Sequence, residues 1–145
     1  MTSTISSTMV AWTAIVSGFG ESIERVDTKH VGQEVTLVLP RFGCSTGGVY
    51  QAFDRLGPDA VDVPAVRRVV DSDTLVDAML INDLTPAACI VEPRLGALIE
   101  RIRKSIGRGV HVTGSGSTCF VLGRVDRACI CDLVPDCRIV NTRLV

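Results

Sequence analysis

The run Gly114-Ser-Gly-Ser-Thr118 is the part of this sequence best suited to hold an anion. Its glycines permit positive φ angles and let a ligand approach the main chain closely. Consecutive amides in such a turn can form a concave nest of donors, and the hydroxyls of Ser115, Ser117 and Thr118 would add to it. Glycine-rich turns also join strands without binding anything, so the pentapeptide alone leaves both interpretations open.

Other residue types offer no catalytic constellation. His30 and His111 are far apart in the sequence, and His111 alternates with two valines, which is typical of a sheet-surface residue rather than a base. No activating base accompanies the serine hydroxyls. The acidic residues between positions 54 and 73 lack a matching cation or metal signature, which predicts a solvated loop. We therefore expect no catalytic residue and no metal site in this chain.

The six cysteines lie mostly inside apolar runs, at positions 44, 89, 119, 129, 131 and 137. Buried free cysteine behaves as a small hydrophobic residue. Only Cys129 and Cys131 are close, and no further pair of ligands completes a zinc pattern. The sequence predicts structural thiols rather than disulfides or metal ligands.

Length and composition limit the class of protein. A chain of 145 residues, 46% hydrophobic and 21% charged, fits one soluble domain with a substantial core. A net charge of −1 and 4% aromatic residues argue against a nucleic-acid groove. The N-terminus has neither a basic region nor a long apolar region, and no apolar run reaches the length of a membrane span. We expect a cytoplasmic protein without nucleic-acid or membrane partners, with a poorly ordered segment 1–10 and one domain over 11–145.

Apolar patterns and breakers predict the elements around the glycine run. Strands are expected over 9–16, 21–26, 34–39 and 137–142, and as a hairpin on either side of residues 114–118. Helices are expected from the cap Ser45-Thr46 to residue 56, from 72–73 to about 80, from 86 to 91, from 93 to 106 and from 124 to 133. Residues 57–71, with two prolines and several aspartates, are expected to form a surface loop.

Helical periodicity predicts which faces are buried. Val49, Ala52, Phe53 and Leu56 share one face of their helix, and Tyr50 falls about 100° from Val49, on the rim of that face. The helix from residue 93 carries a longer apolar stripe, formed by Leu95, Leu98, Ile99, Ile102 and Ile106. The order strand, helices, strand, strand, helix, strand predicts an α+β, ferredoxin-like split βαβ sandwich, with an antiparallel sheet and helices on one face.

Three blocks in order resemble the C-terminal part of the GHMP family of small-molecule kinases. They are Leu37-Val-Leu-Pro with Ser45-Thr and Tyr50, then Asn82-Asp-Leu-Thr-Pro-Ala-Ala88, then Thr113-Gly-Ser-Gly-Ser-Thr-Cys-Phe120. An upstream piece, Thr13-Ala-Ile-Val-Ser-Gly-Phe-Gly-Glu21, is similar to the family's stretch between its two halves. The resemblance runs from about residue 11 to residue 145.

The resemblance implies a substrate site. Residues Gly114 to Thr118 are similar to the family's third motif and would hold the phosphate-bearing part of a substrate. Ser45, Thr46 and Tyr50 resemble a segment that lines a cytidine pocket, where ring stacking on the base would contribute about 1–3 kcal/mol. Tyr50 covering the edge of the core and Thr46 capping its helix remain alternative roles.

The same resemblance implies what the chain lacks. The family holds ATP phosphates with a Pro-x-x-x-Gly-Leu-Gly-Ser-Ser type of loop, and this sequence has none. Thr4 falls where the family carries a catalytic aspartate, and no lysine partner precedes it. ATP and Mg²⁺ are implied for the complete family enzyme, which phosphorylates a cytidylyl sugar alcohol in the non-mevalonate isoprenoid pathway.

We therefore expect a substrate-side domain that is inactive alone and binds no cofactor by itself. A cytidylyl or phosphorylated small molecule is the expected ligand, and a separately encoded N-terminal half or a second copy is the expected partner. Two alternatives stay open. One is a standalone module that binds a small metabolite, and the other is an interaction domain that pairs through an open sheet edge.

Overall fold

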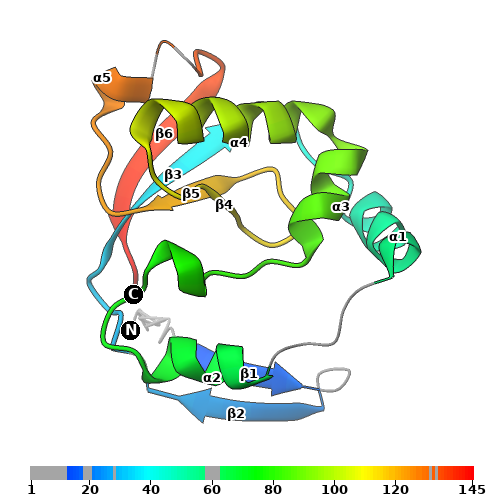
Figure 1. Ribbon diagram of the computed structural model, residues 1–145, viewed down its shortest axis with the longest axis vertical. Helices are drawn as coiled ribbons and strands as arrows, with labels where there is room; N and C mark the ends of the chain where they lie inside the picture. The colour runs from blue at the N-terminus through cyan, green and yellow to red at the C-terminus, as the bar shows by residue number, and fades with distance from the viewer. Residues whose placement is uncertain (1–12, 18–20, 28, 58–62, 131, 133) are drawn as a thin grey trace, which may run out of the picture.

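A four-stranded antiparallel sheet positions the glycine run. The computed structural model describes residues 13–17, 21–27, 29–57, 63–130, 132 and 134–145. Strands β3 (Glu34–Pro40), β4 (His111–Val112), β5 (Cys119–Leu122) and β6 (Cys137–Arg143) lie in the order β4-β5-β3-β6 (Figure 1). The prediction of an α+β protein with an antiparallel sheet is confirmed. The expected segment 1–10, residues 9–12 of the first predicted strand, and Thr4 lie outside the described residues.

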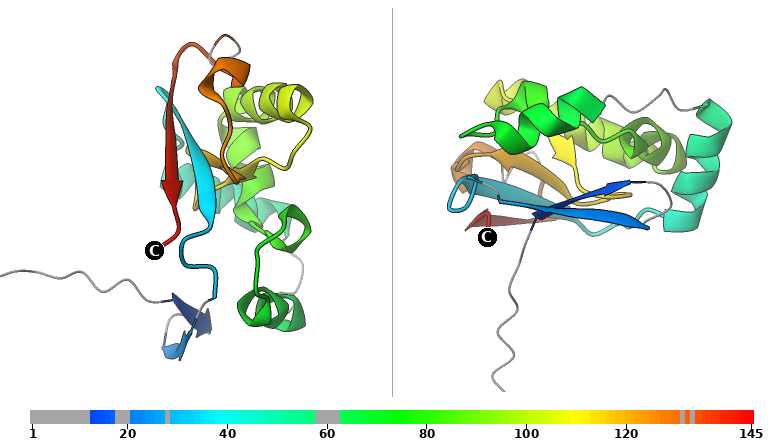
Figure 2. Two further views of the ribbon diagram at one scale, coloured as in Figure 1. Left: turned by 90° about the vertical axis from the view of Figure 1, so that its left-hand side faces the viewer. Right: turned by 90° about the horizontal axis from the view of Figure 1, so that it is seen from below.

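Helices cover one face of this sheet, as expected (Figure 2). They are α3 (Leu84–Val91), α4 (Pro93–Ile106) and the short α5 (Arg127–Ile130), whereas α1 (Thr46–Leu56) packs beside α3 at the end of the sheet. The predicted stripe of α4 is confirmed, since Leu95, Leu98, Ile99 and Ile102 are buried. They pack in one core with Val38, Val112, Cys119 and Val121 of the sheet.

Local signals begin and end the helices where the sequence indicates. The Ser45 side chain caps α1 by accepting a hydrogen bond from the Gly48 amide, and Gly57 ends the helix with φ 67°. Pro93 opens α4, where the missing amide hydrogen costs nothing. In α1, Val49 and Ala52 are buried as predicted, whereas Leu56 is half exposed.

A two-stranded hairpin forms a second, separate sheet. Strands β1 (Thr13–Ser17) and β2 (Ser22–Val26) pair antiparallel beside α2 (Val63–Asp71) (Figure 1). An ion pair between Glu24 and Arg67, with two nitrogen–oxygen contacts of 2.9 and 2.6 Å, joins hairpin and helix. Because α2 occupies 63–71, the expected surface loop over 57–71 is wrong for that part. Pro64 stands in the first turn of α2, where proline is tolerated. Residues 58–62 lie outside the described part.

The helix expected from 72 to about 80 is not formed. This segment contains only the 3-10 turn η1 (Asp77–Met79), and Val76 is half exposed. The Gln33 carboxamide instead bonds both the amide and the carbonyl of Leu75, each at 3.0 Å, which holds the segment extended. These bonds from Gln33 take the place of the main-chain bonds that a helix would make at Leu75. The apolar spacing of residues 72–80, although typical of a helix, therefore predicted the wrong structure.

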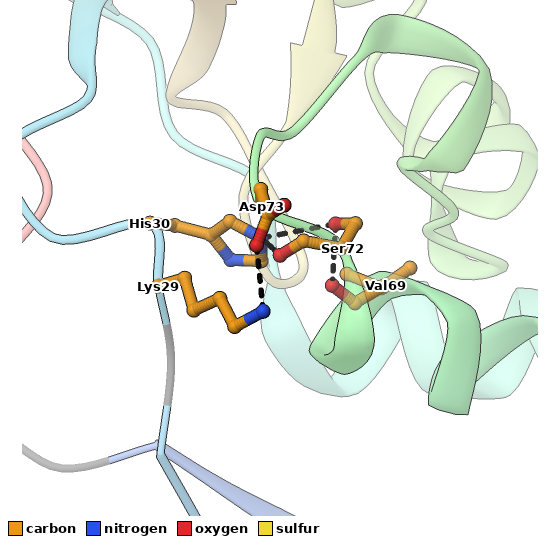
Figure 3. Close-up of polar contacts among 5 residues, drawn as sticks. All are labelled: Lys29, His30, Val69, Ser72 and Asp73. Atoms are coloured by element: carbon orange, nitrogen blue, oxygen red, sulfur yellow. Dashed lines mark hydrogen bonds and ion pairs between the residues drawn. The ribbon is translucent and has the colours of Figure 1, made fainter.

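A second set of contacts fixes the same segment at the end of α2 (Figure 3). His30, 7% exposed, places its Nε2 2.9 Å from the Ser72 carbonyl and 3.0 Å from the Ser72 hydroxyl. The Ser72 hydroxyl donates its hydrogen to the Val69 carbonyl. In its contact with His30 the hydroxyl oxygen is therefore the acceptor, and His30 Nε2 is the donor. Lys29 pairs with Asp73 at 2.6 Å. The expectation that the acidic residues up to position 73 have no matching cation is therefore wrong for Asp73.

The helix expected over 124–133 is shorter in the structure. Its N-terminal part is held as a loop, because the Val125 amide donates to the Thr36 hydroxyl and the Arg124 carbonyl accepts from Arg108. Asp126 then accepts from the Ala128 amide and starts α5. Residues 131 and 133 are outside the described part of the chain.

Candidate functional site

The predicted glycine run is the connection between the edge strand β4 and β5. Val112 and Cys119 are paired across the hairpin. The Thr113 amide donates to the Thr118 carbonyl at 3.0 Å, and the Gly116 amide closes the turn on Thr113 at 3.1 Å. Gly114 and Gly116 have φ angles of 58° and 87°, which side chains rarely adopt. The structure thus confirms a tight glycine turn between neighbouring strands.

One side of the turn is fastened to the segment that follows β3. The Ser117 hydroxyl, largely buried, donates to the Phe42 carbonyl. A side chain added at Gly116 would place its Cβ 3.0 Å from Cys44 Sγ and 3.3 Å from Leu95 Cδ2. The Ser117 proton is therefore engaged within the protein, and Gly116 is needed for close packing as well as for its φ angle.

The start of α1 contacts the turn on its other side. Thr46 Oγ1 and Ser115 Oγ lie 3.2 Å apart, which joins two segments 69 residues distant in the sequence. Tyr50 follows Thr46 by four residues, so both lie on the same side of α1. The Tyr50 side chain is on the surface, with the residue 51% exposed. Ser45, which precedes Thr46, uses its hydroxyl to cap α1. The structure thus brings Thr46 to the turn and leaves the Tyr50 ring accessible.

The turn retains unused donors. In the described part of the chain, the amides of Ser115, Ser117 and Thr118 have no hydrogen-bond partner. Unpaired amides of a turn can bind an anion, with the hydroxyls of Ser115 and Thr118 beside them. The predicted phosphate nest and its occupation by a ligand both stay predictions.

Asn82, the first residue of the second family block, is a positioning residue whose role the sequence does not indicate. Its side-chain nitrogen donates to the carbonyls of Val112 at 2.8 Å and Gly114 at 2.9 Å, and its oxygen accepts from the Leu84 amide at 3.1 Å. One carboxamide therefore ties the glycine turn to the start of α3. An asparagine two residues before a helix is a visible capping signal, but its contact with the turn depends on tertiary structure.

Asp77 holds the outer strand beside the turn. Its carboxylate accepts from the Gly109 amide at 2.8 Å and lies 2.9 Å from His111 Nε2. The hydrogen bond from His111, with the weaker effect of the Gly109 amide, keeps the pKa of Asp77 below its usual range despite partial burial. The His111 ring also lies against Phe120, with 5.3 Å between ring centroids. The histidine is thus an anchored sheet residue, half buried rather than fully on the surface.

The described residues include no cluster for metal chemistry. No group of three or more histidine, cysteine, aspartate or glutamate residues capable of holding a metal ion occurs among them. Five described cysteines are free thiols, and Cys131 lies outside this part of the chain. No described helix is long and apolar enough to cross a membrane.

Comparison with known proteins finds kinase relatives for this chain. A 4-diphosphocytidyl-2-C-methyl-D-erythritol kinase of Thermobifida fusca is 35% identical over 119 residues, covering 79% of this chain and 38% of the relative. The corresponding kinase of a Nocardioides species is 38% identical over 129 residues, covering 83% of this chain and 42% of the relative. This chain is homologous to part of 4-diphosphocytidyl-2-C-methyl-D-erythritol kinase. The predicted resemblance to the GHMP kinases is thereby confirmed.

A solved structure of such a kinase agrees with the fold. The crystal structure of a 4-(cytidine 5'-diphospho)-2C-methyl-D-erythritol kinase matches with a TM-score of 0.62 and 25% identity, over 88% of this chain and 48% of that chain. No family model matches the sequence. The chain spans about two fifths of the length of the curated relatives reported above.

The residues present do not fit the ATP and Mg²⁺ that this kinase family uses. The sequence contains no glycine-rich loop of the Gly-Leu-Gly-Ser-Ser type that opens a helix, and the described residues contain no carboxylate cluster for a metal. That residues 114–118 hold a substrate phosphate stays a prediction. We therefore derive no phosphoryl-transfer step from this chain.

Proposed function

We propose that this chain is the C-terminal, substrate-side domain of an enzyme related to 4-diphosphocytidyl-2-C-methyl-D-erythritol kinase. In this proposal the turn 114–118 holds the phosphate-bearing part of a cytidylyl substrate, and Tyr50 stacks on the base. The chain alone has no kinase activity, because it carries neither the ATP-phosphate loop nor the aspartate of the family. ATP, Mg²⁺ and those groups belong to the remainder of the complete enzyme.

The observation that carries the proposal is the contact between Thr46 and Ser115. It joins the segment with the family's cytidine-pocket pattern to the segment with its phosphate-turn pattern. The sequence indicates the two segments independently, through different motifs. Their contact in the structure supports a single ligand that touches both. The homology covers both segments within a single stretch of the kinase relatives.

A helix-bearing split βαβ arrangement also belongs to the proposal. Strand β3 followed by helices, the hairpin β4–β5, then α5 and β6 follow the ferredoxin-like order. This topology places the turn 114–118 at the same end of the sheet as the start of α1, since Val38 pairs with Cys119 just after the turn. Because the turn 114–118 and the start of α1 lie at one end of the sheet, a single ligand can contact both.

Titration of the purified chain with CDP, followed by amide NMR, tests the ligand. We expect saturable shifts at Gly114, Ser115 and the first turns of α1. Replacement Tyr50→Leu should weaken CDP binding about tenfold, since loss of base stacking is worth about 1–3 kcal/mol. Gln51→Ala, on the neighbouring exposed position of the same helix, is the matched control and should leave affinity unchanged. Shifts confined to other regions, or equal effects of both variants, would contradict the site.

A kinase assay tests the inactivity of the chain alone. With ATP, Mg²⁺ and the cytidylyl substrate, we expect turnover at the level of a protein-free control. Turnover above that level would reject this part of the proposal while leaving the CDP titration as a separate test of the site.

A separately encoded N-terminal half, or a second copy of this chain, is the proposed partner. Size-exclusion chromatography of the chain alone and with a candidate N-terminal half distinguishes the two. A monomer under both conditions would dismiss both partners. A binding module that acts alone remains the alternative function, favoured by the unpaired amides of the turn if CDP binds without any partner.

A further inference from the structure

A cavity of about 600 Å³ opens between α4 and the loops at the end of β3 and the start of β6. None of the residues predicted for the substrate site lines it. The two loops meet here because β3 leaves the sheet and β6 enters it at the same end, where Pro40 pairs with Cys137. The volume is within the range of pockets that hold small ligands.

Two opposite charges without partners line this cavity. Arg41 follows Pro40 and Asp136 precedes Cys137, so the register of β3 and β6 places Arg41 and Asp136 at facing positions just beyond the strand pair. Neither side chain has an ion-pair or hydrogen-bond partner among the described residues, and the two form no ion pair with each other. A neighbouring guanidinium and carboxylate that do not pair can each bind one charged group of the same ligand.

The other charged side chains of the lining are already engaged. Glu92 accepts hydrogen bonds from Arg94 at 2.8 and 2.6 Å, so these two charges balance. Arg101 has an interaction of its own within the chain and is not free to pair with a ligand. The charges left for a ligand are therefore those of Arg41 and Asp136, one of each sign.

An apolar wall lies beside the two charges. The Phe42 ring, which directly follows Arg41 in the chain, is held by the Arg94 guanidinium at 4.7 Å from the ring centre. A ligand can pack its apolar part on this ring because the stacked pair forms a flat, fixed surface. Further apolar surface is added by Ala97, Leu98 and Val134.

We propose that this cavity binds a free α-amino acid with an apolar side chain. Its carboxylate accepts two parallel hydrogen bonds from the Arg41 guanidinium, and its ammonium group donates to the Asp136 carboxylate. Its side chain packs against Phe42 and the apolar residues of α4. An α-amino acid carries both charges on one carbon, which matches a cation and an anion at facing positions. This site is additional to the proposed cytidylyl site and does not depend on it.

Amide NMR titration of the whole chain with L-phenylalanine tests the proposal. We expect saturable shifts at Phe42, Ala97 and Val134. Two analogues, 3-phenylpropionate without the ammonium group and 2-phenylethylamine without the carboxylate, should each bind about tenfold more weakly, the usual effect of losing a charged hydrogen bond. Glycine keeps both charges and should also bind more weakly, because it lacks the apolar side chain.

Variants assign each charge to its group on the ligand. Arg41→Gln and Asp136→Asn should each weaken phenylalanine binding about tenfold. Arg41→Gln should also abolish the advantage of phenylalanine over 2-phenylethylamine, and Asp136→Asn its advantage over 3-phenylpropionate. Both residues are exposed, so the variants should retain the amide spectrum of the folded chain. Arg55→Gln and Asp54→Asn are the matched controls, since both residues are exposed on α1 outside the cavity.

Three outcomes would overturn the proposal. They are the absence of saturable shifts at the cavity with phenylalanine, equal affinities for phenylalanine and 3-phenylpropionate, and equal weakening by the control variants. Tyr50→Leu separates this site from the cytidylyl site, because it should weaken CDP binding and leave phenylalanine binding unchanged.

Discussion

The side-chain nitrogen of Asn82 donates to the carbonyl oxygen of Gly114 over 2.9 Å, across 32 residues of sequence. The same nitrogen holds Val112, and the side-chain oxygen caps α3 at Leu84. The position and shape of the glycine turn therefore depend on the Asn82 carboxamide, which acts without contacting a ligand.

Replacement Asn82→Ala should destabilise the protein by about 1–3 kcal/mol, because two carbonyls and one amide lose their partner. Asn82→Asp keeps the acceptor for Leu84 and loses the donor to the turn, so it should shift the amides of residues 113–116 while retaining α3. Urea unfolding and amide NMR measure both effects. Asp83→Ala is the control, since Asp83 makes no capping bond. Equal losses for positions 82 and 83 would contradict the role of Asn82.

Alanine at the two turn glycines should have unequal costs. Both residues have positive φ, and a Cβ in that conformation costs about 1–2 kcal/mol. At Gly114 nothing lies within 4 Å of the added atom, whereas at Gly116 it meets Cys44 Sγ at 3.0 Å. Gly116→Ala should therefore lower the unfolding free energy more than Gly114→Ala. The comparison uses urea melts of the two variants, and the reverse ranking would reject the packing seen at Gly116.

Acid should weaken the anchor of β4. The pKa of Asp77 is lowered in the folded chain, mainly by the bond from His111, so its carboxylate favours folding. That contribution is complete above the unfolded pKa of about 3.9 and is lost as the pH falls through the lower folded value. Asp77→Asn should thus differ from the parent in urea midpoint at pH 6, and the difference should shrink below pH 4. A gap that stays constant down to pH 2 would exclude this origin. The carboxylate is partly exposed, so the effect is reduced by solvent.

Buried and exposed cysteines should differ in their rate of alkylation. Burial, with smaller effects from Cys89, Cys137 and Cys44, raises the pKa of the Cys119 thiol to about 12. The thiol form is favoured in the folded state, so this stability is present below pH 9 and is lost as the pH rises toward about 12. Native chain treated with iodoacetamide at pH 8 should be alkylated at exposed Cys129 and protected at Cys119, as read by peptide mass spectrometry. Equal labelling of both residues in folded protein would be inconsistent with the packing.

The contacts of His30 should act locally. Replacement His30→Ala removes two bonds to Ser72 and opens the joint between the end of α2 and the segment after β2. We expect faster amide exchange over residues 29–33 and 72–75, with β3 and β5 unchanged, in hydrogen-exchange measurements. Lys29→Ala, which removes only an exposed ion pair, is the control and should have a small effect. Uniformly faster exchange across the four-stranded sheet would show a different role for the histidine.

Periodic and capped segments could be predicted from the sequence. The stripe from Leu95 to Ile106 indicated α4, Ser45 indicated the start of α1, and the glycines indicated the turn between β4 and β5. These signals are local, because caps, amphipathic faces and positive φ depend on neighbouring residues. The family resemblance then correctly indicated the kinase homology.

The features that could not be predicted depend on distant partners. The segment after Ser72 has an apolar spacing typical of a helix, yet Gln33, 42 residues away, holds Leu75 extended. Pro64 suggested a loop, although it fits the first turn of α2. The clasp of Asn82 on the glycine turn and the contact of Thr46 with Ser115 likewise require the folded arrangement. Position in the sequence alone does not show such pairs.

The central strand β3 has a consequence for how the chain assembles. Both of its neighbours, β5 and β6, come much later, and Thr36 bonds groups 87 and 105 residues further along. Loop closure over such distances slows folding, because its entropic cost precedes any gain from pairing. During synthesis β3 emerges with both edges unpaired, and it stays unpaired until β5 and β6 have been made. A nascent β3 is therefore a natural client for chaperones, whereas α4 can already form while β6 is still untranslated.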